Sequence, residues 1–94
     1  MTTQDKYEAM RRTLDRYFGG ESPDSKDMMR ADNFMKRVSA DPHTQYNYCV
    51  NMARKIKKPD KAYRRGVAFQ NVGADPDCVR VFHKRAFELI GGTL

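Results

Sequence analysis

Prolines and glycines divide this chain into short segments, and that division limits the possible folds more than any other feature. Three prolines directly follow a residue that can cap a helix, in the pairs Ser22-Pro23, Asp41-Pro42 and Asp75-Pro76. Proline suits the first helical position because its missing N–H would have no partner there, and the preceding side chain accepts a hydrogen bond from a free N–H. Gly19-Gly20 and Gly73 end other segments, as glycine does after a helix. We therefore predict about five short helices joined by short linkers.

Apolar residues recur at helical spacing within these segments. The clearest case lies in the stretch from Asp60 to Ile90, around which the chain is organised. Its last segment carries apolar residues at i, i+3, i+7, i+10 and i+11, which is one face of a helix: Val79, Phe82, Ala86, Leu89 and Ile90. In the earlier segments the expected buried stripes are Tyr7, Met10, Leu14, Tyr17 and Phe18, then Met28, Ala31, Phe34, Met35 and Val38, then Tyr46, Cys49, Val50, Ala53 and Ile56.

These patterns predict an all-α protein in which residues 1–94 form a single helical domain. Runs of alternating β-branched residues are absent from the sequence, and a chain of this length supports one small core. We expect Thr2 or Thr3 to cap the first helix, Ser22-Pro23 to open the second, and Pro59 to break the chain so that Asp60 caps the fourth. Because linkers are short and the last two helices read as a repeat unit, we expect a right-handed α-α superhelix rather than a closed bundle.

The formal net charge is +6, and its densest part is the run from Arg54 to Lys61. The commoner explanation of such a run is a solvated helix end, where cations are favoured by the helix dipole. The functional interpretation is a partner-binding surface, and the residues expected to form it are Arg54, Lys55, Lys57, Lys58, Lys61, Arg64 and Arg65 with the tyrosines Tyr48 and Tyr63. Such a surface suits an acidic protein, an anionic lipid or nucleic acid, and the charge alone chooses none of them. Nucleic acid fits because its phosphates bind cations and its bases stack on aromatic rings.

Candidate chemistry is weak throughout the sequence. Cys78 and His83 are five residues apart, which places them on different sides of one helix, and Cys49 and His43 are six apart. No C-x-x-C or H-x-x-x-H pair and no glycine-rich phosphate loop occurs. We expect no enzyme activity, no cofactor and no metal site. Cys49 and Cys78 are expected to be free, buried thiols in a reducing compartment. No apolar run approaches the ~20 residues needed to cross a bilayer, so we expect a soluble or peripheral protein.

The C-terminal hairpin resembles a tetratricopeptide-type unit. That pattern places small residues where helix axes approach closely and large ones between hairpins, here Gly66, Ala68, Phe69, Gly73, Phe82, Ala86 and Leu89.

A second resemblance covers residues 7–73 and is more particular. The first helix ends in the aromatic pair Tyr17-Phe18, and the second carries Arg30 and Asn33. The turn Asp41-Pro42 follows, and after it come two basic segments that begin with Ala, namely Ala53-Arg54-Lys55-Ile56 and Ala62-Tyr63-Arg64. In this order and spacing the sequence is similar to the all-helical subunit Va family of mitochondrial cytochrome c oxidase (subunit VI in yeast nomenclature). It departs from that family in its shorter Asp-Pro turn and in Lys57-Lys58, which stand where the family has Asn-Asp.

The resemblance implies a fold and a role. The family forms a five-helix right-handed superhelix and serves as a non-catalytic, peripheral subunit on the matrix side of the inner membrane, in contact with other oxidase subunits. If the resemblance does not hold, a cytoplasmic location is expected. The alternative function is a small basic helical protein associated with nucleic acid or a ribonucleoprotein, a class that includes phage-encoded inhibitors.

Overall fold

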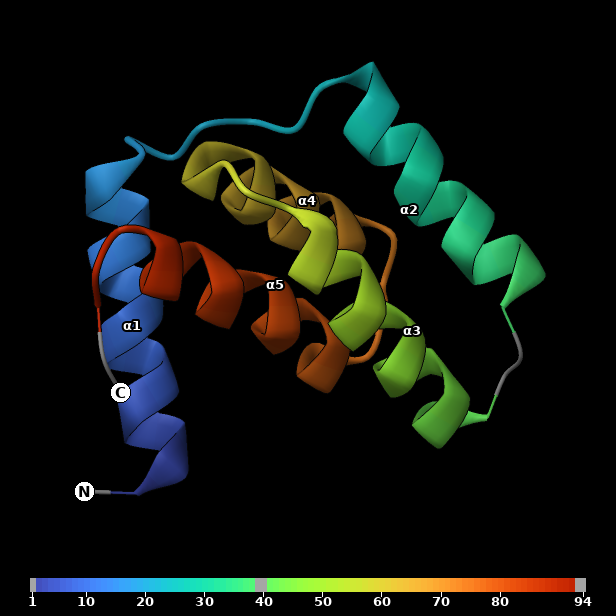
Figure 1. Ribbon diagram of the computed structural model, residues 1–94, viewed down its shortest axis with the longest axis horizontal. Coiled ribbons are helices and arrows are strands. Elements are labelled where there is room, and N and C mark those ends of the chain that lie inside the picture. Colours follow the sequence, from blue (N-terminus) through green and yellow to red (C-terminus); the bar gives the residue numbers. More distant parts are fainter. Residues whose placement is uncertain (1, 39–40, 93–94) are drawn as a thin grey trace.

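The computed structural model describes residues 2–38 and 41–92. They form the helices α1 (Thr3–Tyr17), α2 (Ser25–Arg37), α3 (Pro42–Lys55), α4 (Pro59–Asn71) and α5 (Pro76–Leu89), and this part of the chain contains no strand (Figure 1). The prediction of an all-α fold with about five helices is therefore confirmed. None of the helices in the described ranges is long and apolar enough to span a membrane.

Capping side chains start four of the five helices. Thr2 and Asp5 form a capping box at α1, and Asp41 and Asp75 cap α3 and α5 with a proline in the first helical turn, as predicted. The start of α2 differs from the expectation, since Asp24 rather than Ser22 is the cap and Pro23 lies before it. Asp24 prevails because it completes a capping box, accepting a hydrogen bond from the Asp27 N–H at 2.8 Å while the Asp27 carboxylate accepts from the Asp24 N–H at 3.1 Å.

The start of α4 also corrects the sequence prediction. Pro59 does not lie outside the helix but is its first residue, and Asp60 is the second. The residue in the cap position is Lys58, whose side chain makes no capping hydrogen bond. This start relies on proline, whose ring sets a helical φ and whose missing N–H requires no partner. Lys58 is thereby left at the N-terminal end of α4, where its side chain is available for other contacts.

The hairpin of α4 and α5 is the centre of the structure. These two helices make the most extensive contact with each other; α2 packs on α4, and α3 and α1 pack on α5 (Figure 1). The turn between α4 and α5 passes through Gly73, whose φ of +79° is one that glycine adopts without strain. The expectation that the chain is organised around the stretch from Asp60 to Ile90 agrees with this arrangement.

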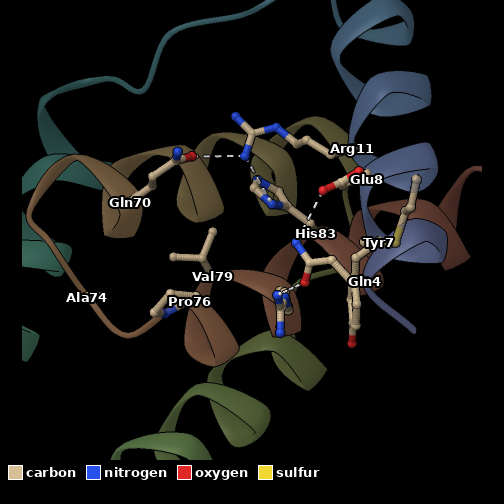
Figure 2. A pocket seen from close by; sticks show the side chains of 11 residues that line it. Gln4, Tyr7, Glu8, Arg11, Gln70, Ala74, Pro76, Val79 and His83 are labelled. Carbon is tan, nitrogen blue, oxygen red and sulfur yellow. Dashed lines mark hydrogen bonds between the residues drawn. The ribbon is translucent and has the colours of Figure 1, made fainter. Parts of the chain in front are cut away.

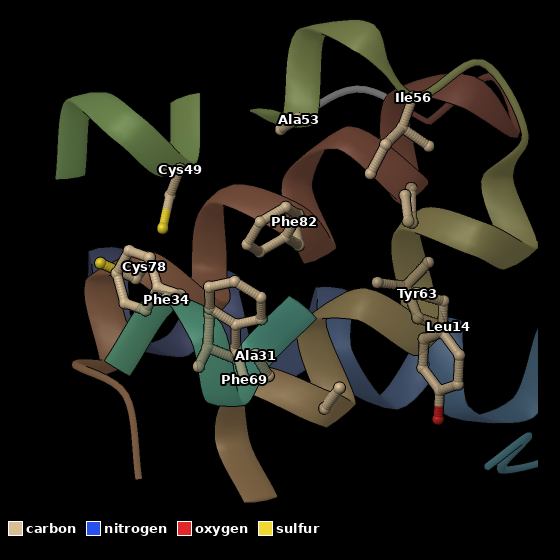
Figure 3. Close-up of a cluster of buried hydrophobic side chains, with 14 of the residues drawn as sticks. Leu14, Ala31, Phe34, Cys49, Ala53, Ile56, Tyr63, Phe69, Cys78 and Phe82 are labelled. Carbon is tan, nitrogen blue, oxygen red and sulfur yellow. The ribbon is translucent and has the colours of Figure 1, made fainter. Parts of the chain in front are cut away.

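The core runs as a row of aromatic rings across the helices (Figure 3). The ring centroids of Phe34 and Phe69 are 4.8 Å apart, and those of Phe69 and Phe82 are 4.7 Å apart. These rings come from α2, α4 and α5, so one row of contacts joins three helices. Cys49 and Cys78 are free and buried beside this row, as predicted.

The outer helices bury narrower stripes than their sequences suggest. Tyr17 is 64% exposed, Tyr46 45% and Met35 43%, although all three fall on the predicted apolar stripes. The reason is that α2 and α3 each pack extensively on only one other described helix. In the core, α2 fully buries only Ala31 and Phe34, and α3 only Cys49 and Ala53. Met29, which is not one of the residues of the predicted α2 stripe, is exposed.

The closest approach between α4 and α5 predicts a destabilising effect of Gly66→Ala. A Cβ at this position would lie 2.5 Å from the His83 Nε2 atom, and His83 is itself buried. Helix propensity alone would stabilise α4 by about 1 kcal/mol. We expect a net loss of about 1–2 kcal/mol instead, because the imidazole must shift from its buried position and from its contact with Arg11. Urea unfolding measures this change, and the double variant with His83→Ala serves as control. If the cost of Gly66→Ala persists without the imidazole, the clash is not its cause.

Candidate functional site

A groove of about 530 Å³ opens where the start of α2, the end of α3 and the start of α4 meet. Its lining contains eight basic and three acidic side chains: Lys26, Arg30, Lys55, Lys57, Lys58, Lys61, Arg64 and Arg65, with Asp24, Asp27 and Asp60. Most of the sequence-predicted basic residues are therefore gathered at one place. We call this site the basic groove.

Asp27 lies within the groove lining and is almost fully buried, with 2% of its surface exposed. Its Oδ1 accepts a hydrogen bond from Arg65 Nε at 3.3 Å, and its Oδ2 accepts one from Arg64 Nε at 3.4 Å. Arg64 Nη1 also donates to Glu21 at 2.6 Å and to Asp60 at 3.0 Å. One carboxylate of α2 thus binds two consecutive arginines of α4 and ties the two helices together.

The pKa values of the two arginines shift in opposite directions, because burial and ion pairing compete with different outcomes at each. Burial by itself would lower the pKa of Arg64, but its hydrogen bonds with Glu21 and Asp60 outweigh that effect and raise it. Burial lowers the pKa of Arg65, and its hydrogen bond with Asp27 offsets this only in part. Both guanidinium groups stay charged at neutral pH because arginine titrates far above it.

The acidic side chains of the groove are already engaged within the protein. Asp24 caps α2, while Asp27 and Asp60 bind Arg64 and Arg65. The remaining six cations make no ion pair or hydrogen bond to any described residue through their side chains: Lys26, Arg30, Lys55, Lys57, Lys58 and Lys61. The groove therefore presents positive charge that the protein itself does not neutralise.

The structure separates the predicted binding residues into three groups. Lys55, Lys57, Lys58 and Lys61 are exposed and line the groove, whereas Arg54 is exposed but outside its lining. Arg64 and Arg65 line it too, but their guanidinium groups are used in the internal ion pairs. Tyr48 is 45% exposed, as expected, and its ring packs against Phe34 outside the lining.

The expectation that Tyr63 is an exposed contact residue is wrong. Only 2% of its surface is exposed. Its ring stacks on Phe18 with a centroid separation of 4.9 Å, and its hydroxyl donates to Asp15 Oδ1 at 2.7 Å. Tyr63 points to α1 while its neighbour Arg64 points to the groove, because consecutive residues on a helix face different directions.

Two groove residues, Lys26 and Arg30, were missed by the sequence analysis. They lie on α2, about 30 positions before the basic run on the chain. Their spacing of four residues places them on one face of α2, and this was the available signal. What the sequence did not provide was the side of α4 on which α2 packs.

A second cavity, of about 310 Å³, lies between α1, the end of α4 and α5 (Figure 2). Arg11 Nη1 donates to Gln70 Oε1 at 2.9 Å, and Arg80 Nη2 donates to Gln4 Oε1 at 2.8 Å. The Arg80 guanidinium also stacks over the Tyr7 ring at 4.8 Å from its centroid. These polar groups bind one another across the helices, so we interpret the rim of this cavity as the fastening of α1 rather than as a binding site.

His83 lies at the base of this cavity and is 3% exposed. Its Nδ1 is 3.5 Å from Arg11 Nη1, and its Nε2 has no hydrogen-bond partner in the part of the protein that the structure describes. Since a guanidinium only donates, Nδ1 is the acceptor and we assign the proton to Nε2. Burial, together with the nearby charge of Arg11, lowers the pKa of His83 to about 3. This imidazole is therefore neutral at physiological pH.

No cluster of three or more metal-binding side chains occurs among residues 2–38 and 41–92. Comparison with protein-family models, curated proteins and solved structures found no match to this chain. The case for the basic groove therefore rests on its own geometry and charge.

The buried ion pairs predict a large effect of Asp27→Asn. The variant keeps the shape of the side chain but removes the charge that compensates the buried Arg65, so we expect a loss of about 3 kcal/mol in the free energy of unfolding. Asp32→Asn, at an exposed position of the same helix, is the matched control and should change stability by less than about 0.5 kcal/mol. Equal effects of the two variants in urea unfolding would show that Asp27 has no special role.

The buried His83 predicts acid sensitivity. An imidazole with a pKa of about 6.5 when unfolded and about 3 when folded binds a proton more readily in the unfolded chain. Stability should therefore fall as the pH drops below about 6.5, by up to about 1.4 kcal/mol per pH unit. His83→Leu should flatten the profile between pH 6.5 and 4.5, whereas His43→Gln, at an exposed position, should not. A wild-type profile that is already flat in this window would contradict the assignment.

Proposed function

We propose that this protein is a non-catalytic interaction subunit that docks on a larger protein assembly through its basic groove. The observation that carries the proposal is the set of six uncompensated cations, Lys26, Arg30, Lys55, Lys57, Lys58 and Lys61, around one concave surface. Like charges held together this way repel each other and raise the free energy of the isolated protein. A partner that brings carboxylates to the groove removes this repulsion, so the arrangement favours an acidic docking surface.

The form of the groove supports docking rather than catalysis. Its floor is held rigid by the pairs of Asp27 with Arg64 and Arg65, while the lysines around them project on long flexible stems. Lysine is a point charge that adapts to different acceptor positions. Charges at the rim of an interface mainly accelerate association and select the partner, and the buried centre provides most of the affinity. The half-exposed Tyr48, whose ring contacts Phe34 of α2 outside the groove lining, is available as a separate apolar contact.

The resemblance of residues 7–73 to subunit Va of cytochrome c oxidase makes that complex the assembly we propose, with the protein peripheral on the matrix side of the mitochondrial inner membrane. Lys57 and Lys58 replace an Asn-Asp pair of the family. A subunit with this change needs a more acidic partner surface than the family's own, so we expect the neighbouring subunit to carry compensating carboxylates.

We also propose that the five helices form a tetratricopeptide-like right-handed superhelix. The packing of α2 on α4 supports this arrangement, because corresponding helices of adjacent hairpins pack on each other in such stacks. The burial of Gly66, Ala68 and Phe69 on α4 and of Phe82 and Ala86 on α5 supports it as well. The contact of α1 with α5 is an addition that closes the first helix onto the last.

Nucleic acid is the second candidate partner, and the dominance of lysine in the groove favours it. Five of the six uncompensated cations are lysines, which neutralise phosphates without reading bases. Six phosphate contacts would give a slope of log affinity against log salt of about −5 for duplex DNA and about −4 for a single strand. Sequence-independent binding is expected in that case, because no aromatic side chain lines the groove.

The test is recovery of the tagged protein from its cells of origin, followed by mass spectrometry of the bound proteins. We expect the double variant Lys57→Glu/Lys58→Glu to lose at least nine-tenths of the recovered partner, since it places two negative charges among the remaining cations. Lys6→Glu/Lys84→Glu makes the same change of charge at exposed positions outside the groove and should retain the partner.

Each proposal has its own contradicting result. Recovery of respiratory-chain subunits with the wild type but not with the groove variant supports docking on the oxidase. Recovery of another acidic assembly keeps the interaction role and rejects the oxidase. If RNA or DNA is recovered with the steep salt dependence given above, and no protein partner is, the protein-docking proposal is wrong.

A further inference from the structure

Cys49 and Cys78 are far apart in the sequence but meet in the core. Cys49 comes from the middle of α3 and Cys78 from the first turn of α5, and the Cys49 sulfur points toward Cys78 in Figure 3. The two thiols are close enough for each to influence the pKa of the other. Both side chains are buried, with 0% of the surface of Cys49 and 1% of that of Cys78 exposed. The sequence predicts two free, buried thiols, and their proximity is a property of the fold.

The two thiols are not equivalent. Burial raises the pKa of both, and for Cys49 the neighbouring sulfur adds to that effect. For Cys78 the interaction with the Cys49 thiol acts in the opposite direction and lowers the pKa, although the charges of Asp75 and Asp77 raise it. Cys78 is also the third residue of α5, and the N-terminus of a helix stabilises a thiolate. Cys78 is therefore the sulfur that ionises first.

We propose that Cys49 and Cys78 are a dithiol site that a low-molecular-weight disulfide, such as glutathione disulfide, oxidises to a disulfide joining α3 to α5. The Cys78 thiolate attacks one sulfur of glutathione disulfide, forming a mixed disulfide and releasing one glutathione thiolate. Cys49, after losing its proton to solvent, attacks the Cys78 sulfur and releases the second glutathione. The protein loses two electrons and two protons, and the oxidant becomes two molecules of glutathione.

The packing of α3 controls this reaction. Both sulfurs are closed to solvent in the folded state, so the oxidant reaches them only when α3 separates from α5. That opening is local, because α5 is the one described helix on which α3 packs extensively. Once formed, the bond prevents α3 from separating. Because α3 leads directly into the Lys55–Lys58 edge of the basic groove, oxidation also fixes that edge.

The experiment treats the purified full-length chain with glutathione disulfide at neutral pH and maps its peptides without reduction. We expect a single species in which the peptides of Cys49 and Cys78 are linked within one chain. Its melting temperature should be higher by about 10 °C or more, because the bond closes a long loop in the unfolded state. Low urea, which promotes local opening, should speed the reaction.

Two variants test the order of events. Cys49→Ala should stop at a glutathione adduct on Cys78, whereas Cys78→Ala should form an adduct on Cys49 at least tenfold more slowly. The test of disulfide formation on the wild-type protein does not depend on either variant. Wild-type protein that keeps both thiols in low urea, accumulates only glutathione adducts, or links two chains would overturn the proposal. An oxidised form that melts below the reduced form would do so as well.

Discussion

The interaction on which the structure depends is the contact of Asp27 with Arg64 and Arg65. The carboxylate belongs to α2 and the guanidinium groups to α4, so it fixes the position of a helix that packs extensively on little else. It also determines the charge of the basic groove. The acidic residues bind the arginines and leave the surrounding lysines without ion-pair partners in the described part of the chain. An internal stabilising network thereby creates the positively charged surface for which we propose an anionic partner.

A second set of contacts does the same for α1 at the other side of the central hairpin. Arg11 and Arg80 bind Gln70 and Gln4 across helix boundaries, and Tyr63 donates to Asp15. Beneath them a neutral imidazole, His83, fills the space left open by Gly66. The hairpin of α4 and α5 thus holds α1 and α2 by polar contacts over an apolar core. These contacts give a small protein fixed geometry, but buried polar groups also make it sensitive to acid and to single substitutions.

The fold could be predicted because its signals are local. Capping residues, prolines and glycines act within one turn of a helix, so the number of helices and most of their ends follow from short stretches of sequence. The start of α2 was misplaced only because two capping patterns overlap between Ser22 and Asp27. The site was harder to predict. Nothing near Tyr63 indicates that its ring meets Phe18, and the approach of Lys26 to Lys58, or of Cys49 to Cys78, depends on how separate helices pack.

Lysine reactivity tests the central claim most directly, namely that the groove lysines are free in the isolated protein and become covered by a partner. Brief acetylation of the protein alone and of the complex recovered from cells, read by mass spectrometry at each lysine, compares the two states. The account predicts that Lys26, Lys55, Lys57, Lys58 and Lys61 react readily in the isolated protein and are protected together in the complex, while Lys6 and Lys84 react equally in both. Groove lysines that stay reactive in the complex, with protection appearing at Lys6 or Lys84 instead, would contradict it.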